Sequence, residues 1–398
     1  MPQTDLPEPQ QGAEAGALIA RRHDTLATLE PVWRHLETAG TATAFQRFDW
    51  IGSIESHLAR PNGIKAFVVE VSDATSGETL MLLPFVLKTK ATHSVIEFMG
   101  LNVCDISAPL LAPGYDFPER SGEALWRAIG AVLPKADLVH IDLIDARIGG
   151  RVNPLATLPG VARIPLQSFD VAIDGDPDTI VNRLVSGRMH RTLKKSTRRM
   201  EERGEVGFLV ARTMEHLDTL LPVMIAQRLE RFRALDRFDL MADPHVQAFY
   251  REAAAASLDG RGPVRVFGLS VDGEWIATAY GLVHAGTFHL TIITMAGGSW
   301  EACSPGMATI ARFIRWARQE GLTTMDFSVG EMDYKTGFGG QARDLYALSR
   351  PLTARGHIAA ATQAGAVRLK ERVKAHPRLF SRLRAAVRLF RRRNPSDG

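Results

Sequence analysis

Residues 303–340 read CSPGMATIARFIRWARQEGLTTMDFSVGEMDYKTGFGG, and this stretch decides the fold of the second half of the chain. It opens with the small-residue turn Ser304-Pro305-Gly306, and Ser304 and Pro305 are common helix-opening residues. Apolar residues then recur at steps of three and four, the period of one helix face: Met307, Ile310, Ala311, Ile314 and Ala317. A β-type run, 323–327, follows Gly321, a common helix stop. The stretch therefore predicts the order turn, helix, strand.

The start of the predicted helix is a candidate anion site. The first N–H groups of a helix lack partners within the helix and lie at the positive end of its dipole, so phosphate groups bind well there. The turn matches neither the P-loop pattern nor the glycine pattern of dinucleotide-binding folds. An ordinary helix cap also explains Ser304-Pro305-Gly306, so both interpretations remain open at this point.

Three motifs follow one another in this stretch: S-P-G at 304–306, D-F-S-V-G at 326–330 and Y-K-T-G-F-G at 334–339. Together they resemble the C-terminal acyltransferase domain of the CelD/BcsL family. These are GNAT-type proteins related to the FemAB transferases and linked to cellulose or exopolysaccharide synthesis. The resemblance extends upstream to residues 45–50, 83–85 and 188–204. It implies a layered α/β fold with tandem GNAT-like domains, whose mixed, mostly antiparallel sheets are flanked by helices.

The resemblance also implies a chemistry, namely acyl transfer from an acyl-CoA (acetyl-CoA first of all) to an amine or hydroxyl of a sugar or polysaccharide precursor. Asp326 would act as base if burial raised its pKa, Tyr334 would protonate the leaving thiolate, and Lys335 would hold a phosphate or the oxyanion. The alternative roles are a turn-ordering carboxylate, turn packing and a surface charge. The residues expected to bind the donor are Ser304, Pro305, Gly306, Met307 and Ala308.

A second cluster of candidate site residues lies in the basic segment 188–203, RMHRTLKKSTRRMEER. Its cations recur at steps of three and four and form a stripe on one face of a helix. A solvated helix face explains such a stripe as well as an anion site does. Since the resemblance also extends over a basic helix here, we expect Arg188, Arg191 and Lys195 to bind phosphate or acidic sugar groups of the substrate.

Hydrophobic periodicity and turn residues divide the chain into two similar α/β parts. We expect a disordered lead-in at 1–22, an N-terminal GNAT-like domain at 23–165, a C-terminal GNAT-like acyltransferase domain at 166–355 and a basic amphipathic tail at 356–398. Within the second domain we expect a strand at 169–173 and one continuous helix at 179–203. The Asp272-Gly273 turn predicts a hairpin before the 303–340 stretch.

Composition excludes several classes of protein. The chain of 398 residues is 45% hydrophobic and 23% charged, as in globular proteins, and contains no run of about 18 apolar residues. The N-terminus has no signal-peptide pattern, and two cysteines fit a reducing cytoplasm. His140 and Asp142 share one face of a predicted strand, but no third ligand is apparent, so we expect no metal.

The net charge of +4 is unevenly distributed. Residues 366–398 hold eleven Lys and Arg against two acids, a balance of +9, which leaves about −5 for residues 1–365. Because the positive charge is confined to the tail, nucleic-acid binding by the whole protein is a poor inference. The tail interleaves Arg with Leu, Phe and Val, a pattern typical of helices that lie on a membrane surface. Docking on the protein's own body or on a partner, such as a polysaccharide synthase complex, is the alternative.

The membrane prediction can be tested by liposome flotation. The full chain is expected to float with anionic vesicles, and a chain cut after Gly365 is expected to stay at the bottom, because the cut removes the basic apolar segment. Equal flotation of the two chains would rule out the tail as the membrane contact.

Two other functions remain open from the sequence. One is FemAB-like transfer of an amino acid from a charged tRNA, which needs a larger basic surface than an acidic body offers. The other is a non-catalytic accessory role in a polysaccharide synthase complex. Stabilisation by coenzyme A would favour the acyltransferase over both.

Overall fold

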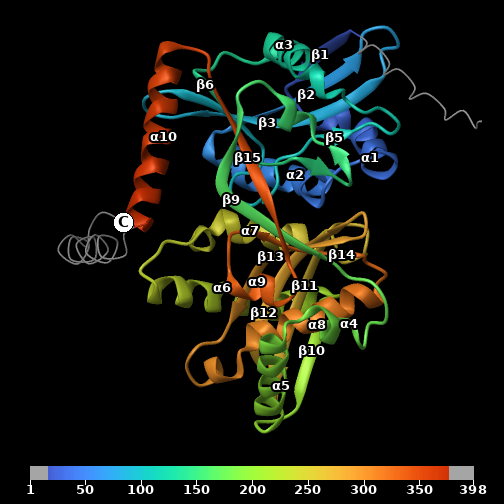
Figure 1. Cartoon of the computed structure of the whole chain (residues 1–398), viewed down its shortest axis with the longest axis vertical. Coiled ribbons are helices and arrows are strands. Elements are labelled where there is room, and N and C mark those ends of the chain that lie inside the picture. Colours follow the sequence, from blue (N-terminus) through green and yellow to red (C-terminus); the bar gives the residue numbers. More distant parts are fainter. Residues whose placement is uncertain (1–16, 376–398) are drawn as a thin grey trace, which may run out of the picture.

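The computed structural model describes residues 17–375. Within these residues, two α/β halves share one 13-stranded, mostly antiparallel sheet, with strand order β1-β2-β3-β4-β6-β15-β9-β14-β13-β12-β11-β10 and β5 paired to β3 (Figure 1). Only the pairs β4–β6 and β13–β14 are parallel. A second, two-stranded sheet joins β7 to β8. None of the described helices is both long and apolar enough to cross a membrane.

The N-terminal half contains three α-helices and the first eight strands. Its helices are α1 (Glu30–Ala39), α2 (Phe48–Ile54) and α3 (Gly122–Val132). Its strands are β1 (Leu18–His23), β2 (Lys65–Asp73), β3 (Thr79–Thr89), β4 (Ser94–Phe98), β5 (Leu110–Leu111), β6 (Leu138–Asp145), β7 (Arg147–Ile148) and β8 (Arg151–Val152).

The C-terminal half contains the remaining helices and strands of the described residues. Its helices are α4 (Ile180–Leu184), α5 (Gly187–Glu201), α6 (Met214–Ala234), α7 (Pro244–Ala255), α8 (Pro305–Gln319), α9 (Asp333–Gly337) and α10 (Ala354–Ala375). Its strands are β9 (Val161–Ala172), β10 (Val206–Val210), β11 (Val264–Val271), β12 (Glu274–His284), β13 (Thr287–Met295), β14 (Thr324–Val329) and β15 (Gln341–Pro351).

The two halves are joined by the long strands β9 and β15, which cross between them (Figure 1). β9 pairs on one side with β14 and on the other with β15. β15 in turn pairs with β6 of the N-terminal half. The expected domain boundary at 165/166 therefore falls inside β9. The halves cannot be separated there without breaking the sheet.

The core confirms the helix predicted from the 303–340 stretch. The inner face of α8 (Ile310, Phe313, Ile314) is fully buried and packs with Phe267 and Phe288 of the sheet. On the other side of the sheet, Trp50 of α2 contacts the rings of Phe249 and Tyr250 in α7. The contacts of Trp50 are apolar packing between the two halves.

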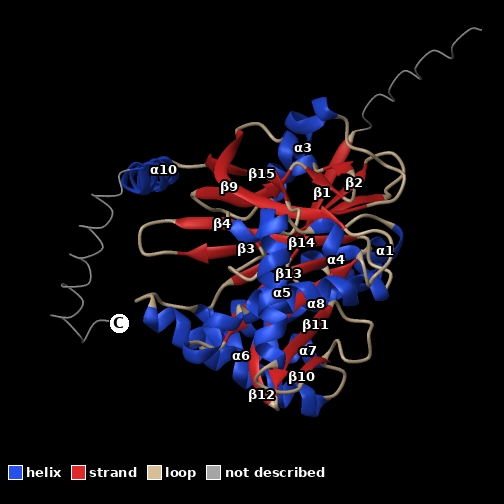
Figure 2. Ribbon diagram, turned by 60° about the horizontal axis from the view of Figure 1, so that its bottom comes forward, coloured by secondary structure: helices blue, strands red, loops and turns tan. Residues whose placement is uncertain are grey.

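Three details of the prediction need correction. Residues 18–22, expected in a disordered lead-in, belong to β1, because backbone pairing with β2 orders them; residues 1–16 lie outside the described residues. The helix expected at 179–203 breaks at Val185-Ser186, where the Ser186 hydroxyl caps α5. The tail is helical to Ala375, and its helix α10 contacts β15 and β6. Figure 2 shows α10 at one side of the molecule. The apolar residues predicted to bind a membrane, at 379–390, lie outside the described residues.

Candidate active site

The candidate site is built around two parallel strands that separate. β13 and β14 pair only at Thr287–Thr324, Phe288–Met325 and His289–Asp326. β14 pairs with β9 from its first residue onward, so beyond Asp326 it is held by β9 alone. β13 stays paired with β12, but the register shifts there and leaves Thr291 as an extra, unpaired residue. Such a bulge bends a strand and unpairs its backbone. The two strands therefore leave a widening gap that runs toward the start of α8.

The start of α8 offers one free backbone donor. The amides of Met307 and Ala308 donate to the carbonyl of Ser304 at 3.0 and 3.3 Å, and Pro305 has no N–H. Among the described residues, the Gly306 N–H has no hydrogen-bond partner. Ser304 has a positive φ of 48°, which turns the chain sharply into the helix. Of the amides of Gly306, Met307 and Ala308 only that of Gly306 is free, because the first helical turn closes on the Ser304 carbonyl.

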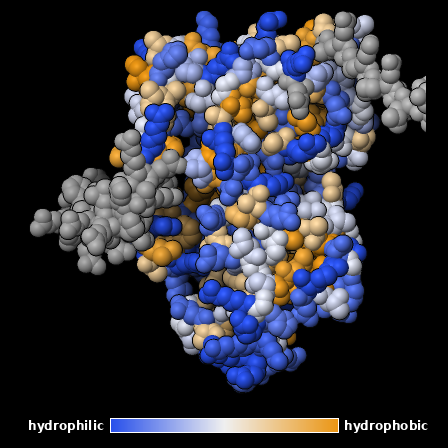
Figure 3. Space-filling view, in the orientation of Figure 1, coloured by the Kyte–Doolittle hydropathy of each residue, from blue (hydrophilic) through white to orange (hydrophobic). Residues whose placement is uncertain are grey.

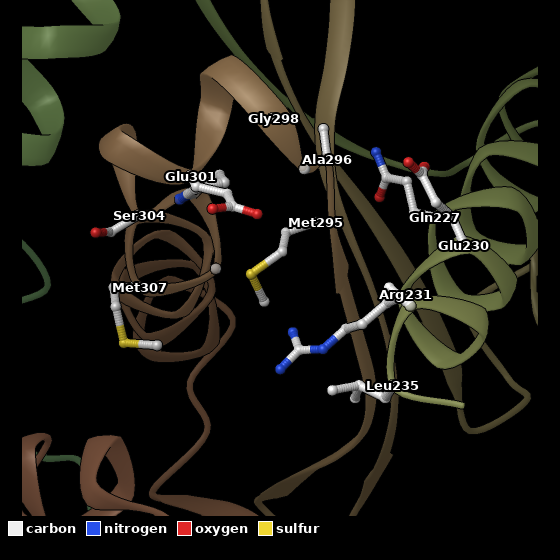
Figure 4. Close-up of a pocket in the computed structure, with 14 residues that line it drawn as sticks. Gln227, Glu230, Arg231, Leu235, Met295, Ala296, Gly298, Glu301, Ser304 and Met307 are labelled. Atoms are coloured by element: carbon white, nitrogen blue, oxygen red, sulfur yellow. The ribbon is translucent and has the colours of Figure 1, made fainter. Parts of the chain in front are cut away.

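A cavity of about 590 Å³ opens at this helix start (Figure 4). Ser304, Pro305, Gly306 and Met307 line it, as expected for donor-binding residues, whereas Ala308 is buried in the core. The opposite wall comes from α6, which the sequence did not indicate as part of a site. The α6 residues and the remaining lining residues are Gln227, Glu230, Arg231, Ala234, Leu235, Met295, Ala296, Gly297, Gly298 and Glu301.

Arg231 is the cation of this cavity. Figure 4 shows its guanidinium directed from α6 into the space below Met295. Its side chain has no hydrogen bond or ion pair with any other residue in the range 17–375. It lies close enough to Tyr334 to lower the pKa of that phenol, although burial dominates and raises the pKa to about 12. The free guanidinium and the free Gly306 amide on facing walls are groups that can bind an anion, and the carboxylates of Glu230 and Glu301 line the same cavity.

Asp326 is buried and fully engaged. Its Oδ2 lies 2.8 Å from Nδ1 of His289, and its Oδ1 accepts the Ser328 N–H at 2.7 Å. Burial would raise the pKa of Asp326, but the hydrogen bond and charge of His289, with Arg343, hold it below its usual value. The expected rise in the pKa of Asp326 is therefore absent, and the turn-ordering alternative fits its contacts.

Lys335 is neither a surface charge nor free to hold a phosphate. Its side chain is buried, and its Nζ donates to the carbonyls of Ser328 and Val329 at 2.9 and 3.0 Å. Burial lowers its pKa to about 8. Lys335 thus holds the end of β14 in shape, because these two carbonyls receive their hydrogen bonds from it.

Asp105 of the N-terminal half reaches this end of β14 and was missed in the sequence. The Ser328 hydroxyl donates to Asp105 Oδ2, and Ser328 has a positive φ of 68°. Burial raises the pKa of Asp105 to about 6, with a further contribution from Asp326. No motif marks the loop that carries Asp105, so only the fold brings this carboxyl to the gap between β13 and β14. Strained residues of this kind cluster at functional sites.

The basic segment forms α5, as predicted, and Arg188, Arg191 and Lys195 are exposed on it. They do not line the cavity at the start of α8. The helix is nevertheless fixed to the rim of that cavity, because Ser196 and Arg199 donate to the carbonyls of Cys303 and Ala302. The predicted substrate-binding and donor-binding residues are therefore neighbours on separate surfaces.

The N-terminal half repeats this geometry without the opening. β4 and β6 pair in parallel at Val95–Leu138, Ile96–Val139 and Glu97–His140, which matches the three pairs of β13 and β14. The equivalent helix start, at Gly122 of α3, is covered: a Cβ there would lie 2.0 Å from the carbonyl oxygen of Thr157. The two halves therefore share this strand pairing, and the cavity described above lies at the start of α8.

Comparison with known proteins agrees with this geometry. Residues 187–336 match the acetyltransferase (GNAT) domain family. The matched segment runs from the start of α5 into α9, and the C-terminal half has a GNAT-like fold. Since the N-terminal half repeats its strand pairing, the predicted tandem GNAT-like fold is confirmed. The match covers neither β9 nor β15, the strands through which the two halves are joined.

Several solved structures resemble the chain over most of its length. FemX is 12% identical, with a TM-score of 0.55, over 82% of this chain and 96% of its own. L-PGS from Bacillus licheniformis is 15% identical, with a TM-score of 0.49, over 90% and 99%. A tandem GNAT protein from the clavulanic acid biosynthesis pathway is 12% identical, with a TM-score of 0.45, over 84% and 98%. No curated protein matches the chain by sequence.

Proposed function

We propose that the protein transfers an acyl group from acyl-CoA, acetyl-CoA first of all, to an amine or hydroxyl of a sugar or polysaccharide precursor of the cell envelope. The observation that carries this proposal is the cavity at the start of α8, with the free Gly306 amide and the unpaired Arg231 on facing walls. Its position at the end of the gap between β13 and β14 suits a donor that lies along the gap with its phosphates at the helix start.

Asp105 and Ser328 supply the best-supported route for the proton of the acceptor. The acceptor amine passes a proton to the Ser328 hydroxyl, which passes its own to the Asp105 carboxylate. The amine nitrogen forms a bond to the acyl carbon, the carbon–sulfur bond breaks, and the thiolate leaves and takes up a proton. A carboxyl whose pKa burial raises to about 6 is ionised at neutral pH and close to the range that general bases use.

Tyr334 remains the candidate acid for the thiolate. Its hydroxyl has no hydrogen-bond partner in the part of the chain that the structure describes, and its pKa of about 12 keeps it protonated at neutral pH. A cavity of about 330 Å³ between the halves, lined by His289, Asp326 and Arg343, offers space for the acceptor. His289 and Asp326, which line this cavity, act electrostatically on Asp105, so the cavity lies near the proposed base, although Asp105 is not one of its lining residues.

Two other functions compete with this proposal. FemAB-like transfer from a charged tRNA is favoured by the likeness to FemX across 82% of the chain. An accessory role in a polysaccharide synthase complex, on the cytoplasmic side of the membrane, is suggested by the resemblance to the CelD/BcsL family and by the basic tail. The free donors at the start of α8 favour a phosphate-bearing donor over the accessory role. The net charge of about −5 for residues 1–365 favours acyl-CoA over a charged tRNA.

Titration calorimetry with acetyl-CoA tests the proposal. One donor is expected to bind per chain, because the α3 start is covered by Thr157. Arg231→Ala is expected to weaken acetyl-CoA binding by at least about tenfold, since it removes a charge-assisted contact to phosphate. Arg233→Ala is the matched control: Arg233 is exposed on the same helix but does not line the cavity.

The alternatives give different results. Binding of two donors per chain would contradict the closed N-terminal site. No binding of acetyl-CoA together with binding of a charged tRNA would favour aminoacyl transfer. No binding of either would favour the accessory role.

A further inference from the structure

One face of α5 carries a basic stripe, defined as Arg188, Arg191, Lys194, Lys195 and Arg198. All five side chains are exposed. The opposite face of the helix is anchored: Ser196 and Met200 are buried, and Met189 and Leu193 pack against the core that contains α8. The orientation of the stripe is therefore fixed by the fold rather than by the cations themselves.

The stripe is almost uncompensated. Its one ion pair within the described residues joins Arg198 to Glu202 at 3.2 Å. The side chains of Arg188, Arg191, Lys194 and Lys195 have no hydrogen bond, ion pair or ring contact with another residue of 17–375. Figure 3 shows a strongly hydrophilic surface at the lower end of the molecule, where Figure 1 places α5. Neighbouring like charges repel, so the binding of anions to a surface of this kind lowers its free energy.

The stripe also has a direction and a fixed relation to the donor cavity. From Arg188 to Arg198 it rises about 15 Å along the helix, with neighbouring cations about 5–6 Å apart. Arg199, next to the end of the stripe, donates to the carbonyl of Ala302, and the preceding residue, Glu301, lines the cavity. A long anion bound along α5 therefore ends beside the rim of the donor site.

We propose that α5 binds a polyanionic glycan, a chain of acidic sugars or phosphate-bearing units, as the extended part of the acceptor. That a glycan binds here is argued from the basic stripe alone. That the bound glycan is the acceptor rests on the proposed acyl transfer. Regularly spaced anions on a flexible chain match a single row of cations. Nucleic acid fits less well, because α5 contains no aromatic residue on which bases stack and residues 1–365 have a net charge of about −5.

Fluorescence anisotropy with labelled chains tests the proposal in the full-length protein. The probes are an oligogalacturonate, which bears carboxylates, a poly(glycerol phosphate), which bears phosphates, a neutral dextran of similar length, and single-stranded DNA. The wild type is expected to bind at least one of the two acidic chains in a salt-dependent manner and to ignore dextran. The better of the two identifies the anionic group.

Charge reversal locates the binding surface. The triple variant R188E/R191E/K195E is expected to weaken binding of the acidic chain by at least about tenfold and to reduce its salt dependence. The matched control R21E/K65E/K135E reverses three exposed cations of the N-terminal half and keeps the same net charge, tail included. It is expected to bind within about twofold of the wild type. Because all six positions are exposed, both variants are expected to melt like the wild type.

Several results would overturn the proposal: no binding of either acidic chain, equal losses in the two triple variants, or tighter binding of single-stranded DNA. Acetyl-CoA affinity is measured in the same variants. A loss confined to acetyl-CoA in R188E/R191E/K195E would assign the stripe to the donor and also overturn the proposal. If the wild type binds the acidic chain through α5 but ignores acetyl-CoA, the acyl transfer fails while the glycan surface stands.

Discussion

Asp105→Asn is expected to lower kcat for acyl transfer by about 10²–10³-fold and to leave the affinity for acetyl-CoA unchanged. The substitution keeps the shape of the side chain and an oxygen that accepts the Ser328 hydroxyl, but it removes the proton acceptor. Release of coenzyme A from acetyl-CoA, with glucosamine as acceptor, measures the rate. Asp142→Asn is the matched control, since Asp142 is an exposed carboxylate on β6.

The pH dependence separates a base from a structural role. The wild-type rate is expected to rise as pH increases through about 6, where Asp105 loses its proton, and this limb is expected to vanish in Asp105→Asn. The charges of Asp326, His289 and Lys335 also influence the pKa of Asp105. The pH–rate profiles are therefore compared between proteins that keep these three residues. Ser328→Ala, which removes the hydrogen bond that lowers the pKa of Asp105, is expected to move any residual limb to higher pH.

The free energy of unfolding is expected to change with pH in the opposite direction to the rate. The pKa of Asp105 in the folded protein, about 6, lies above its ordinary value, so the folded state binds more protons than the unfolded state between about pH 4 and 6. Wild-type stability therefore falls as pH rises through this window. Asp105→Asn lacks this loss and is expected to be at least as stable as the wild type at neutral pH. A slow, destabilised variant without a change in the pH profile would make Asp105 structural.

Lys335→Ala is expected to lower the free energy of unfolding by about 2–4 kcal/mol. It leaves the carbonyls of Ser328 and Val329 without their donor and opens a cavity against the ring of Phe169, over which the ammonium lies at 5.5 Å. Urea unfolding measures the change, and Lys135→Ala, at an exposed position, is the matched control. A loss below about 0.5 kcal/mol would show that Lys335 does not hold β14.

Lys335→Met distinguishes packing from charge. The pKa of Lys335 in the folded protein, about 8, lies below its ordinary value, so between about pH 8 and 10.5 the unfolded state binds more protons. Wild-type stability therefore rises with pH in this window, and Lys335→Met is expected to lose that rise while it keeps most of the packing. Wild-type turnover in the folded fraction of Lys335→Met would remove Lys335 from the chemistry.

The sequence by itself determined the elements around the donor site. The three- and four-residue spacing of α8, the Ser304-Pro305-Gly306 turn and the run that forms β14 depend on neighbours along the chain, so they could be predicted. The basic face of α5 was predictable for the same reason. Local pattern did not reveal the break at Val185-Ser186, where one side-chain cap starts a new helix.

Only the tertiary structure decided which of these residues are free to react. Lys335 and Asp326 have the residue types of catalytic groups, yet packing engages Lys335 with two carbonyls and Asp326 with His289. Asp105 and Arg231 carry no motif and reach the site from elements distant in sequence. Burial and partner distance set the pKa and the availability of a side chain, and both depend on contacts between residues far apart in the chain.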